Sequence, residues 1–220
     1  IHHVLTRHEQ GATHMADGYA RTSGKVGVAM ATSGPGAANM VTGLATAMMD
    51  SVPIVCITGQ VPRPAIGSDA FQEMDISGAV IPVTKHSYLV MDIKNLAQTI
   101  KEAFAIARSG RPGPVLIDIP KDVQAEEYDF IYPEEPVKLP GKNPLDKEID
   151  KKSLGDAADL IANAKRPVIL AGHGILLSGA SKEVIELSEK GDIPLSWTLL
   201  GSGAVPASHD LNMGMMGMHG

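Results

Sequence analysis

The chain has 220 residues, of which 44% are hydrophobic, 20% are charged and 4% are aromatic, as expected of a globular protein with an aliphatic core. Its 19 basic and 25 acidic residues give a net charge of −6, which argues against a nucleic-acid partner bound through its phosphates. The single cysteine, Cys56, excludes an intrachain disulfide and fits a reducing compartment, so we expect a cytoplasmic protein. No apolar run is long enough to predict a membrane span.

The first half of the chain alternates predicted helices with short, almost continuous apolar runs. Such runs are typical of strands buried on both faces of a parallel sheet. The alternation therefore predicts an α/β fold with right-handed crossovers between parallel strands. The predicted elements are a helix over 9–21, a strand over 26–31, a helix over 37–49, a strand over 52–58, a helix over 95–109 and a strand over 114–119.

The second half begins with a change of character. Prolines at 133, 136, 140 and 144 stand among charged residues and predict a surface linker. Alternation then resumes, with a helix over 153–164, a strand over 167–171, a turn over 172–174, a helix over 181–190 and a strand from 193.

We expect three parts: a first three-layer domain over 1–127, a linker over 128–152, and an incomplete Rossmann-like domain over 153–220. The chain begins at Ile1 inside an apparent element and ends at Gly220 without terminal character. We therefore expect it to be a fragment of a longer protein.

The carboxyl ends of the predicted strands are the first candidate site. Ligands of α/β proteins bind there, so the junctions at 32–36, 58–60 and 119–121 should converge at one edge. The glycine-rich turn at 33–39 lies between a strand and a helix, where backbone N–H groups can hold an anion. It lacks the third glycine of the dinucleotide fingerprint, and a plain tight turn is an equally good interpretation.

Several residues have simple structural interpretations when they are taken alone. His8 and His14 are six apart, which is the wrong spacing for a zinc-protease helix, and we predict no metal ligands in this chain. Glu9 would ordinarily be a solvated helix residue and Lys121 a surface charge. The methionine-rich end, 213–218, fits either an adaptable core or a loop that faces a ligand.

Taken together, the motifs resemble a known family. Their order is similar to that in the pyrimidine-binding domain of thiamine-diphosphate enzymes, and more closely to the large catalytic subunit of the acetolactate synthase (acetohydroxyacid synthase) family. The resemblance covers essentially the whole chain. It is carried by RHEQGA at 7–12, ADGYAR at 16–21, TSGPG at 32–36, ITGQVP at 57–62, IGSDAFQE at 66–73, TKH at 84–86, GRPGPV at 110–115, PKDV at 120–123 and GMMGMHG at 214–220.

The resemblance implies roles for individual residues. Glu9 would be the catalytic carboxyl at the pyrimidine N1′ of thiamine diphosphate, and burial there would raise its pKa. Pro35 and Asn39 would lie near the same ring. The substrate side would be formed by Gly36, Ala37, Phe71, Gln72 and Lys121. The positions implied for FAD are Arg111, Gly172, Gly174, Thr198, Leu199, Met216, Gly217, Met218, His219 and Gly220.

The resemblance also implies a reaction. Pyruvate would be decarboxylated on thiamine diphosphate, and the hydroxyethyl unit would be transferred to a second pyruvate or to 2-ketobutyrate, the first common step of branched-chain amino-acid synthesis. Mg²⁺, with ligands in an absent C-terminal domain, and FAD would be the further cofactors. The complete protein would be a homodimer or homotetramer, with a possible small regulatory subunit, and this chain alone would be inactive.

Rival interpretations remain at this point. Glyoxylate carboligase shares much of the pattern but lacks a glutamate at the position of Glu9, and the FAD-free catabolic acetolactate synthases lack the pattern at 214–220. Another thiamine-diphosphate-dependent 2-ketoacid carboligase or decarboxylase stays possible. A non-catalytic flavoprotein fragment would have no need of Glu9, Phe71, Gln72 and Lys121 together.

Overall fold

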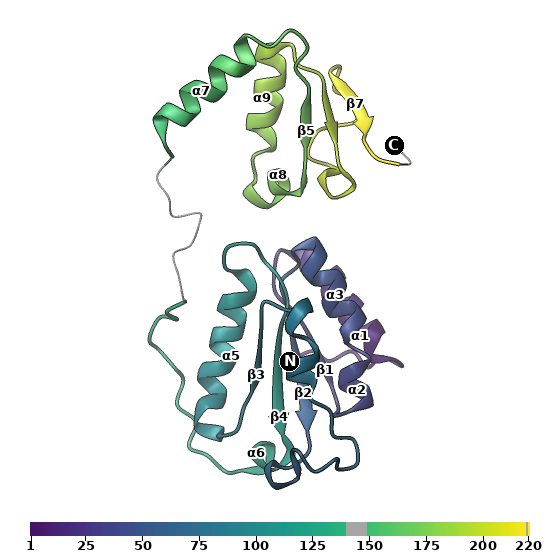
Figure 1. Ribbon diagram of the computed structural model, residues 1–220, viewed down its shortest axis with the longest axis vertical. Coiled ribbons are helices and arrows are strands. Elements are labelled where there is room, and N and C mark those ends of the chain that lie inside the picture. Colours follow the sequence, from purple (N-terminus) through teal and green to yellow (C-terminus); the bar gives the residue numbers. More distant parts are fainter. Residues whose placement is uncertain (140–148, 219) are drawn as a thin grey trace. The chain divides into compact units, whose positions relative to one another are not determined.

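The computed structural model describes residues 1–139, 149–218 and 220. It divides into two compact units, Ile1–Lys147 and Glu148–Gly220. Each unit builds a parallel sheet with helices packed beside it (Figure 1), so the predicted α/β class is confirmed. The predicted boundaries at 127 and 152 remain predictions, and part of the predicted linker lies outside the described residues.

The first unit holds a four-stranded sheet in the order β1-β2-β4-β3, with every pair parallel. Two short 3-10 helices, Arg63–Ala65 and Ile81–Val83, complete its connections. The other elements are α1 (Glu9–Ser23), β1 (Gly27–Ala31), α2 (Pro35–Ala38), α3 (Val41–Asp50), β2 (Ile54–Gln60), α4 (Ile76–Ala79), β3 (His86–Leu89), α5 (Ile93–Arg108), β4 (Val115–Pro120) and α6 (Lys121–Ala125).

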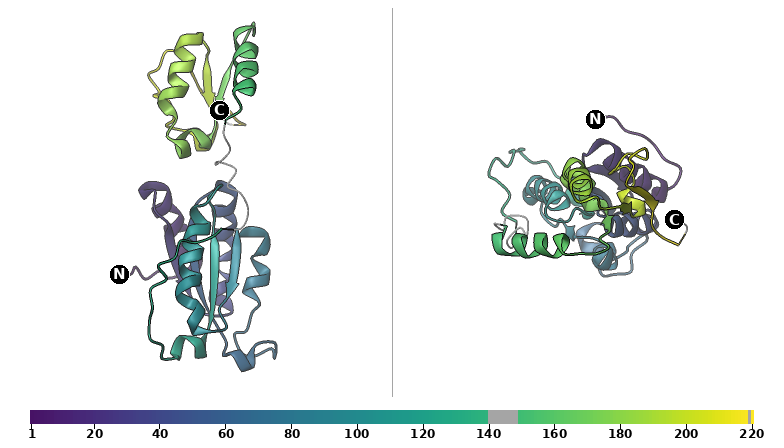
Figure 2. Two further views of the ribbon diagram at one scale, coloured as in Figure 1. Left: turned by 90° about the vertical axis from the view of Figure 1, so that its left-hand side faces the viewer. Right: turned by 90° about the horizontal axis from the view of Figure 1, so that it is seen from above.

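Two apolar layers cover this sheet, one on each face. Helices α1 and α3 pack on one face through small side chains such as Ala16, Ala20 and Ala47. Helix α5 covers the other face with Ala103 and Ala107. Figures 1 and 2 show the helices on the two sides of the strands. Because both faces are covered, every residue of β4 is buried, as the continuous apolar pattern predicts.

The single helix predicted over 37–49 is wrong in one respect. It is divided into α2 and α3, because the Met40 N–H bonds to the Ala37 carbonyl and so interrupts the regular helical ladder. The short elements of this unit, α4, β3, α6 and the two 3-10 helices, were not predicted. Each has three to five residues, too few for a clear periodic signal.

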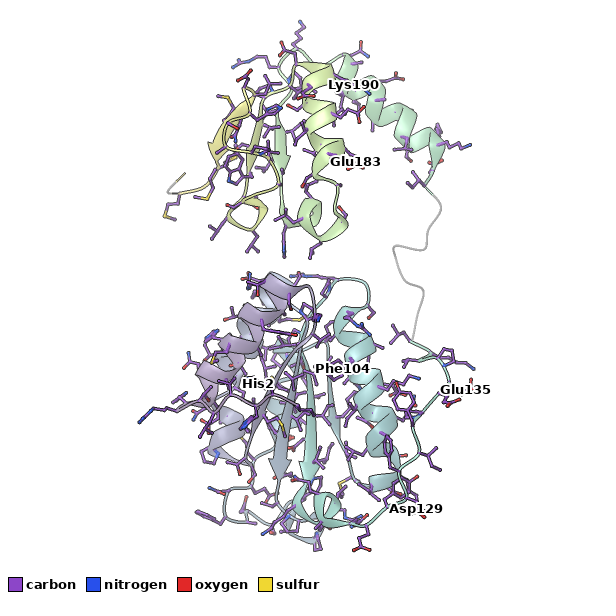
Figure 3. All side chains as sticks on the ribbon, turned by 180° about the vertical axis from the view of Figure 1, so that it is seen from behind. His2, Phe104, Asp129, Glu135, Glu183 and Lys190 are labelled. Atoms are coloured by element: carbon purple, nitrogen blue, oxygen red, sulfur yellow. The ribbon has the colours of Figure 1, made fainter. Side chains whose placement is uncertain are left out.

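The segment that follows α6 lies along α5. Lys101 of α5 donates hydrogen bonds to the carbonyls of Pro133, Glu134 and Glu135. Figure 3 shows this segment, marked by Asp129 and Glu135, beside the helix that carries Phe104. Most of residues 128–139 are exposed, so this segment runs over the surface of the first unit.

The second unit holds a three-stranded parallel sheet in the order β5-β6-β7. Its buried centre is small and consists of Leu195, Ala204 and Val205, with Trp197 among the partly buried neighbours. The turn predicted over 172–174 opens a helix, and the methionine-rich end forms a strand. The elements are α7 (Lys151–Ala162), β5 (Ile169–Ala171), α8 (His173–Ser178), α9 (Ser181–Gly191), β6 (Leu195–Trp197), the 3-10 helix Leu199–Gly201 and β7 (Asn212–Met215).

Among the helices of the described ranges, none combines the length and the apolar character needed to cross a membrane.

Candidate functional site

The carboxyl edge of the first sheet brings the three predicted junctions together. Ala31 at the end of β1 is in register with Thr58 of β2, and Gln60 at the end of β2 is in register with Pro120 of β4. The turn before α2, the loop after β2 and the first residue of α6, Lys121, therefore start from one edge. This is the edge at which α/β proteins bind ligands.

Glu9 stands at the first position of α1, and its carboxylate reaches the segment after β1. Its Oε2 accepts a hydrogen bond of 3.0 Å from Nδ2 of Asn39. Its Oε1 lies close to Gly36, where an added Cβ would be 3.3 Å from that oxygen and 2.8 Å from Cγ2 of Thr32. A side chain at position 36 would crowd the carboxylate, so glycine keeps the space beside Glu9 open.

The pKa of Glu9 differs from the expectation. The structure lowers this pKa, first because Asn39 donates to the charged form and then because of a backbone hydrogen bond. The predicted raising would require burial, and Glu9 is only partly buried in this chain. Glu9 is therefore held as a carboxylate.

A long loop after β2 lies directly on the turn that precedes α2. Gly34 has a φ of +60°, and a Cβ there would come within 2.6 Å of the Gln72 carbonyl oxygen. Gln72 itself has a φ of +64°, which is unusual for a residue with a side chain. Only glycine at position 34 permits this approach. Phe71, beside Gln72, is 90% exposed.

Helix α6 completes the edge. A Cβ added at Gly59 would lie 3.5 Å from the Ser33 nitrogen and 3.6 Å from Nε2 of Gln124, so the end of β2 runs between the turn and α6. Lys121 is exposed at the start of this helix. The structure thus gathers Glu9, Pro35, Gly36, Ala37, Asn39, Phe71, Gln72 and Lys121 around one edge.

Two supporting groups at this edge were missed by sequence reasoning. The guanidinium of Arg63 donates to Oδ2 of Asp122 at 2.7 Å and also to Glu126, and so fastens the loop after β2 to α6. Beneath it, the Asp118 carboxylate accepts from Oγ1 of Thr58 at 2.7 Å and from Nε2 of Gln60 at 2.9 Å. The polar residues Thr58, Gln60 and Asp118 at apolar strand ends were the available signal.

Asp118 is almost completely buried. Burial is the main cause that raises the pKa of Asp118 to about 6, against the lowering effect of its bonds to Thr58 and Gln60, while nearby Asp75 raises it further. The same Gln60 amide also donates to the Met74 carbonyl at 2.7 Å. The hydrogen bonds of Asp118 and Gln60 therefore join β2, β4 and the end of the loop that carries Gln72.

Arg111 is not part of this edge. It lies four residues before β4, at the amino edge of the sheet, where its Nε donates to Oγ of Ser51 at 2.7 Å and its Nη2 to the Met49 carbonyl at 2.9 Å. The guanidinium caps the end of α3. The resemblance gave Arg111 a FAD contact, and within the first unit it stands apart from the Glu9 group.

The second unit repeats the arrangement at its own carboxyl edge. Gly172 and Gly174 follow β5, Thr198 and Leu199 follow β6, and the predicted positions from Met216 onward follow β7. Backbone bonds join these ends, because Thr198 N–H donates to the Ala171 carbonyl at 3.0 Å and Met216 N–H to the Trp197 carbonyl at 2.8 Å. The segment continues with Gly217, Met218 and Gly220, and His219 lies outside the described residues.

Across the described ranges, no three histidine, cysteine, aspartate or glutamate side chains gather in a way that would hold a metal ion.

Comparison of the sequence with known protein families gives a match in each of the two units. Residues 1–79 match the family described as thiamine pyrophosphate enzyme, N-terminal TPP binding domain. Residues 154–220 match the thiamine pyrophosphate enzyme central domain. The two matched regions fall in the two compact units.

Curated relatives match the whole chain. An acetolactate synthase of Arthrospira platensis is 53% identical over 100% of this chain and 38% of its own length. A probable acetolactate synthase large subunit of Methanocaldococcus jannaschii is 52% identical over 99% of the chain and 37% of its own length. An acetolactate synthase large subunit of Corynebacterium glutamicum is 50% identical over 100% and 35%. The chain thus spans little more than a third of the length of these relatives, and it belongs to the acetolactate synthase family of thiamine pyrophosphate enzymes.

Proposed function

We propose that the protein to which this chain belongs is an acetolactate synthase. It decarboxylates pyruvate and joins the two-carbon unit to a second pyruvate or to 2-ketobutyrate, the first common step in the synthesis of valine, leucine and isoleucine. The observation that carries this proposal is the contact of Glu9 with Asn39 beside Gly36, at the edge where Gln72 and Lys121 also lie.

The residues around Glu9 fit thiamine diphosphate. Gly36 leaves room beside the carboxylate that a Cβ would fill, and the lowered pKa of Glu9 keeps an acceptor for a ring N–H at neutral pH. Glu9, Pro35 and Asn39 would hold the pyrimidine ring. When bound, thiamine diphosphate supplies the nucleophilic carbon for 2-ketoacid chemistry. Glu9 then holds a proton at the ring nitrogen, and Asn39 orients its carboxylate.

The remaining residues of the edge form the proposed substrate side. Lys121 is exposed and, among the described residues, has no ion-pair partner, so its ammonium can attract the carboxylate of a 2-ketoacid. Phe71 offers an exposed ring next to Gln72, whose amide can accept or donate. Gly36 and Ala37 are buried and small, which leaves space for the reacting carbons.

FAD and Mg²⁺ are the further cofactors we propose. The carboxyl edge of the second unit offers Gly172, Gly174, Thr198 and Leu199 just after strands, where N–H groups at helix starts suit a pyrophosphate, although the N–H of Thr198 itself donates to the Ala171 carbonyl. Met216, Gly217, Met218, His219 and Gly220 complete the proposed FAD positions, together with Arg111. Mg²⁺ would bind the diphosphate through residues outside this chain.

The assembly and location follow the same reasoning. We propose a cytoplasmic homodimer or homotetramer of the full-length protein, because a site formed at an open edge such as that of Glu9 requires further protein to enclose it. The relatives named large subunits support a small regulatory partner.

The test is acetolactate formation from pyruvate by the full-length protein, with thiamine diphosphate and Mg²⁺ present and with FAD either supplied or removed. Activity that requires thiamine diphosphate and FAD would support the proposal. Activity without FAD would contradict the FAD positions, and turnover of another 2-ketoacid but not of pyruvate would favour a different carboligase or decarboxylase.

A further inference from the structure

The loop that carries Phe71 and Gln72 is organised by its own acidic side chain. The Glu73 carboxylate accepts hydrogen bonds from two backbone N–H groups of the loop, through Oε1 from Gly67 and through Oε2 from Ala70 at 3.0 Å. Glu73 N–H returns a bond of 2.9 Å to the Ala70 carbonyl. The loop therefore closes around one carboxylate without a helix or strand to support residues 67–73.

The conformation that this closure produces is costly without support. Asp69 and Gln72 both have positive φ values, +55° and +64°, which residues with side chains rarely adopt. Bonds from N–H groups to a carboxylate are stronger than bonds between neutral groups. Both carboxylate oxygens of Glu73 accept such bonds, so this side chain bonds within its own loop.

The consequence reaches the candidate site through one backbone contact. The Gln72 backbone lies against Gly34, in the turn that leads to Pro35 and Gly36. On the other side of Glu73 in the chain, the side-chain amide of Gln60 donates a hydrogen bond of 2.7 Å to the Met74 carbonyl. Glu73 stands between these anchors, and a shift of the loop would move Gln72 away from the turn.

We propose that Glu73 is a positioning residue for the substrate side of the site: its carboxylate holds the loop so that Phe71 and Gln72 stand over the Gly34 turn. This inference rests on the proposed function for its kinetic part. Glu9 and Asn39 make their contact independently of the loop, so loss of Glu73 should weaken substrate use and leave thiamine diphosphate binding unchanged.

The test compares E73A and E73Q with the wild type in the full-length protein. Glutamine retains one acceptor oxygen but turns an amide N–H₂ toward the second backbone donor, so its effect should lie between those of wild type and alanine. E102Q is the matched control, because Glu102 on α5 also accepts two hydrogen bonds, from Tyr88 and Gln98, away from the site.

Two readouts are needed. Hydrogen exchange followed by mass spectrometry on a peptide that covers 66–74 should be faster in E73A by about tenfold or more. The KM for pyruvate should rise by about tenfold in E73A and less in E73Q, with the thiamine diphosphate concentration for half-maximal activity within about twofold of wild type. E102Q should change neither readout.

If the 66–74 peptide of E73A exchanged its amide hydrogens as slowly as that of the wild type, the proposal would be overturned. Equal losses of affinity for pyruvate and for thiamine diphosphate would overturn it as well. If the wild-type protein makes no acetolactate, the proposed function fails, and the exchange measurement still decides whether Glu73 holds the loop.

Discussion

The two edges of the first sheet use charged side chains in opposite ways. At the amino edge, Lys85 donates to the carbonyls of Ile106 and Ser109 at the end of α5, and Arg111 donates to carbonyls at the end of α3. Both cations therefore donate hydrogen bonds to carbonyls at the ends of helices. At the carboxyl edge, helices α1, α2 and α6 begin, and Glu9 and Lys121 stand at helix starts.

The difference follows from the direction of the helices. Each helix of a βα unit runs antiparallel to its strand, so helix carbonyls collect at one edge and helix N–H groups at the other. Carbonyls attract Lys85 and Arg111 and give each of them a structural role at a helix end. The N–H edge favours anions such as the Glu9 carboxylate, and there the charged groups Glu9 and Lys121 stand at the first residues of helices.

Replacement of Glu9 should cause the largest loss at the carboxyl edge. We expect E9Q in the full-length protein to lower kcat for acetolactate formation by at least about 100-fold, because the amide cannot hold a proton as the carboxylate does. The fold should be retained, as Asn39 can still bond to the amide oxygen. Steady-state kinetics and circular dichroism measure both. E127Q, an exposed glutamate after α6, is the control, and near-normal turnover of E9Q would contradict the assigned role.

The Gly34 contact should give the next largest effect. G34A adds a Cβ within 2.6 Å of the Gln72 carbonyl oxygen at a φ of +60°. G24A is the matched control, because Gly24 ends α1 at a φ of +69° with open space around it.

We expect G24A to cost about 1 kcal/mol in the free energy of unfolding and to keep activity. G34A should cost more and should lose activity by about tenfold or more, since the turn or the Gln72 loop must move. Urea unfolding and pyruvate kinetics distinguish the two. Equal behaviour of the two variants would mean that the backbone conformation alone matters.

At the amino edge the effects should be on stability and, for the proposed FAD position Arg111, on the affinity for FAD. K85M removes a partly buried cation that caps α5, and we expect a loss of about 1–3 kcal/mol in the free energy of unfolding. R111M should lose less than about 1 kcal/mol, because Arg111 is exposed. In both variants kcat for pyruvate with saturating cofactors should stay within about twofold of wild type. A large fall in kcat for K85M would contradict the inference that Lys85, at the amino edge, has a structural role.

The last expected effects are two changes in the pH dependence of stability, and they have opposite signs. Burial raises the pKa of Asp118 to about 6, so the folded state binds this proton more tightly than the unfolded state. The wild-type protein therefore loses stability from this group as the pH rises from about 4 to 7. D118N should gain stability relative to wild type over that range, by an amount on the order of 1–2 kcal/mol.

Asp122 has the opposite sign. Its bond to Arg63 lowers the pKa of Asp122, so the pair stabilises the folded state above the unfolded pKa and the benefit is lost as the pH falls through the lower folded value. D122N should therefore lose stability relative to wild type at pH 7, and the difference should shrink in acid. Denaturant titrations at several pH values measure both slopes, and slopes of the same sign would contradict the assignment.

Part of the fold and of the site could be predicted because the signals are local. The apolar runs of β1, β2 and β4 and the periodicity of α5 indicate the layered fold directly. The shorter elements were missed for a physical reason. The edge strand β3 is only partly buried, and β7 carries two methionines and a glycine, so neither has the apolar pattern of a central strand.

The sequence by itself determined the fold class, the order of the main elements and the motifs that mark the family. Only the tertiary structure decided that Glu9 bonds to Asn39, that Gln72 lies on Gly34, that Asp118 holds Gln60 and that Arg111 caps α3 on the opposite edge. These contacts join residues that are 30 to 62 positions apart. Local propensity cannot encode such pairs, because their distance depends on strand register and on the direction in which each helix returns across the sheet.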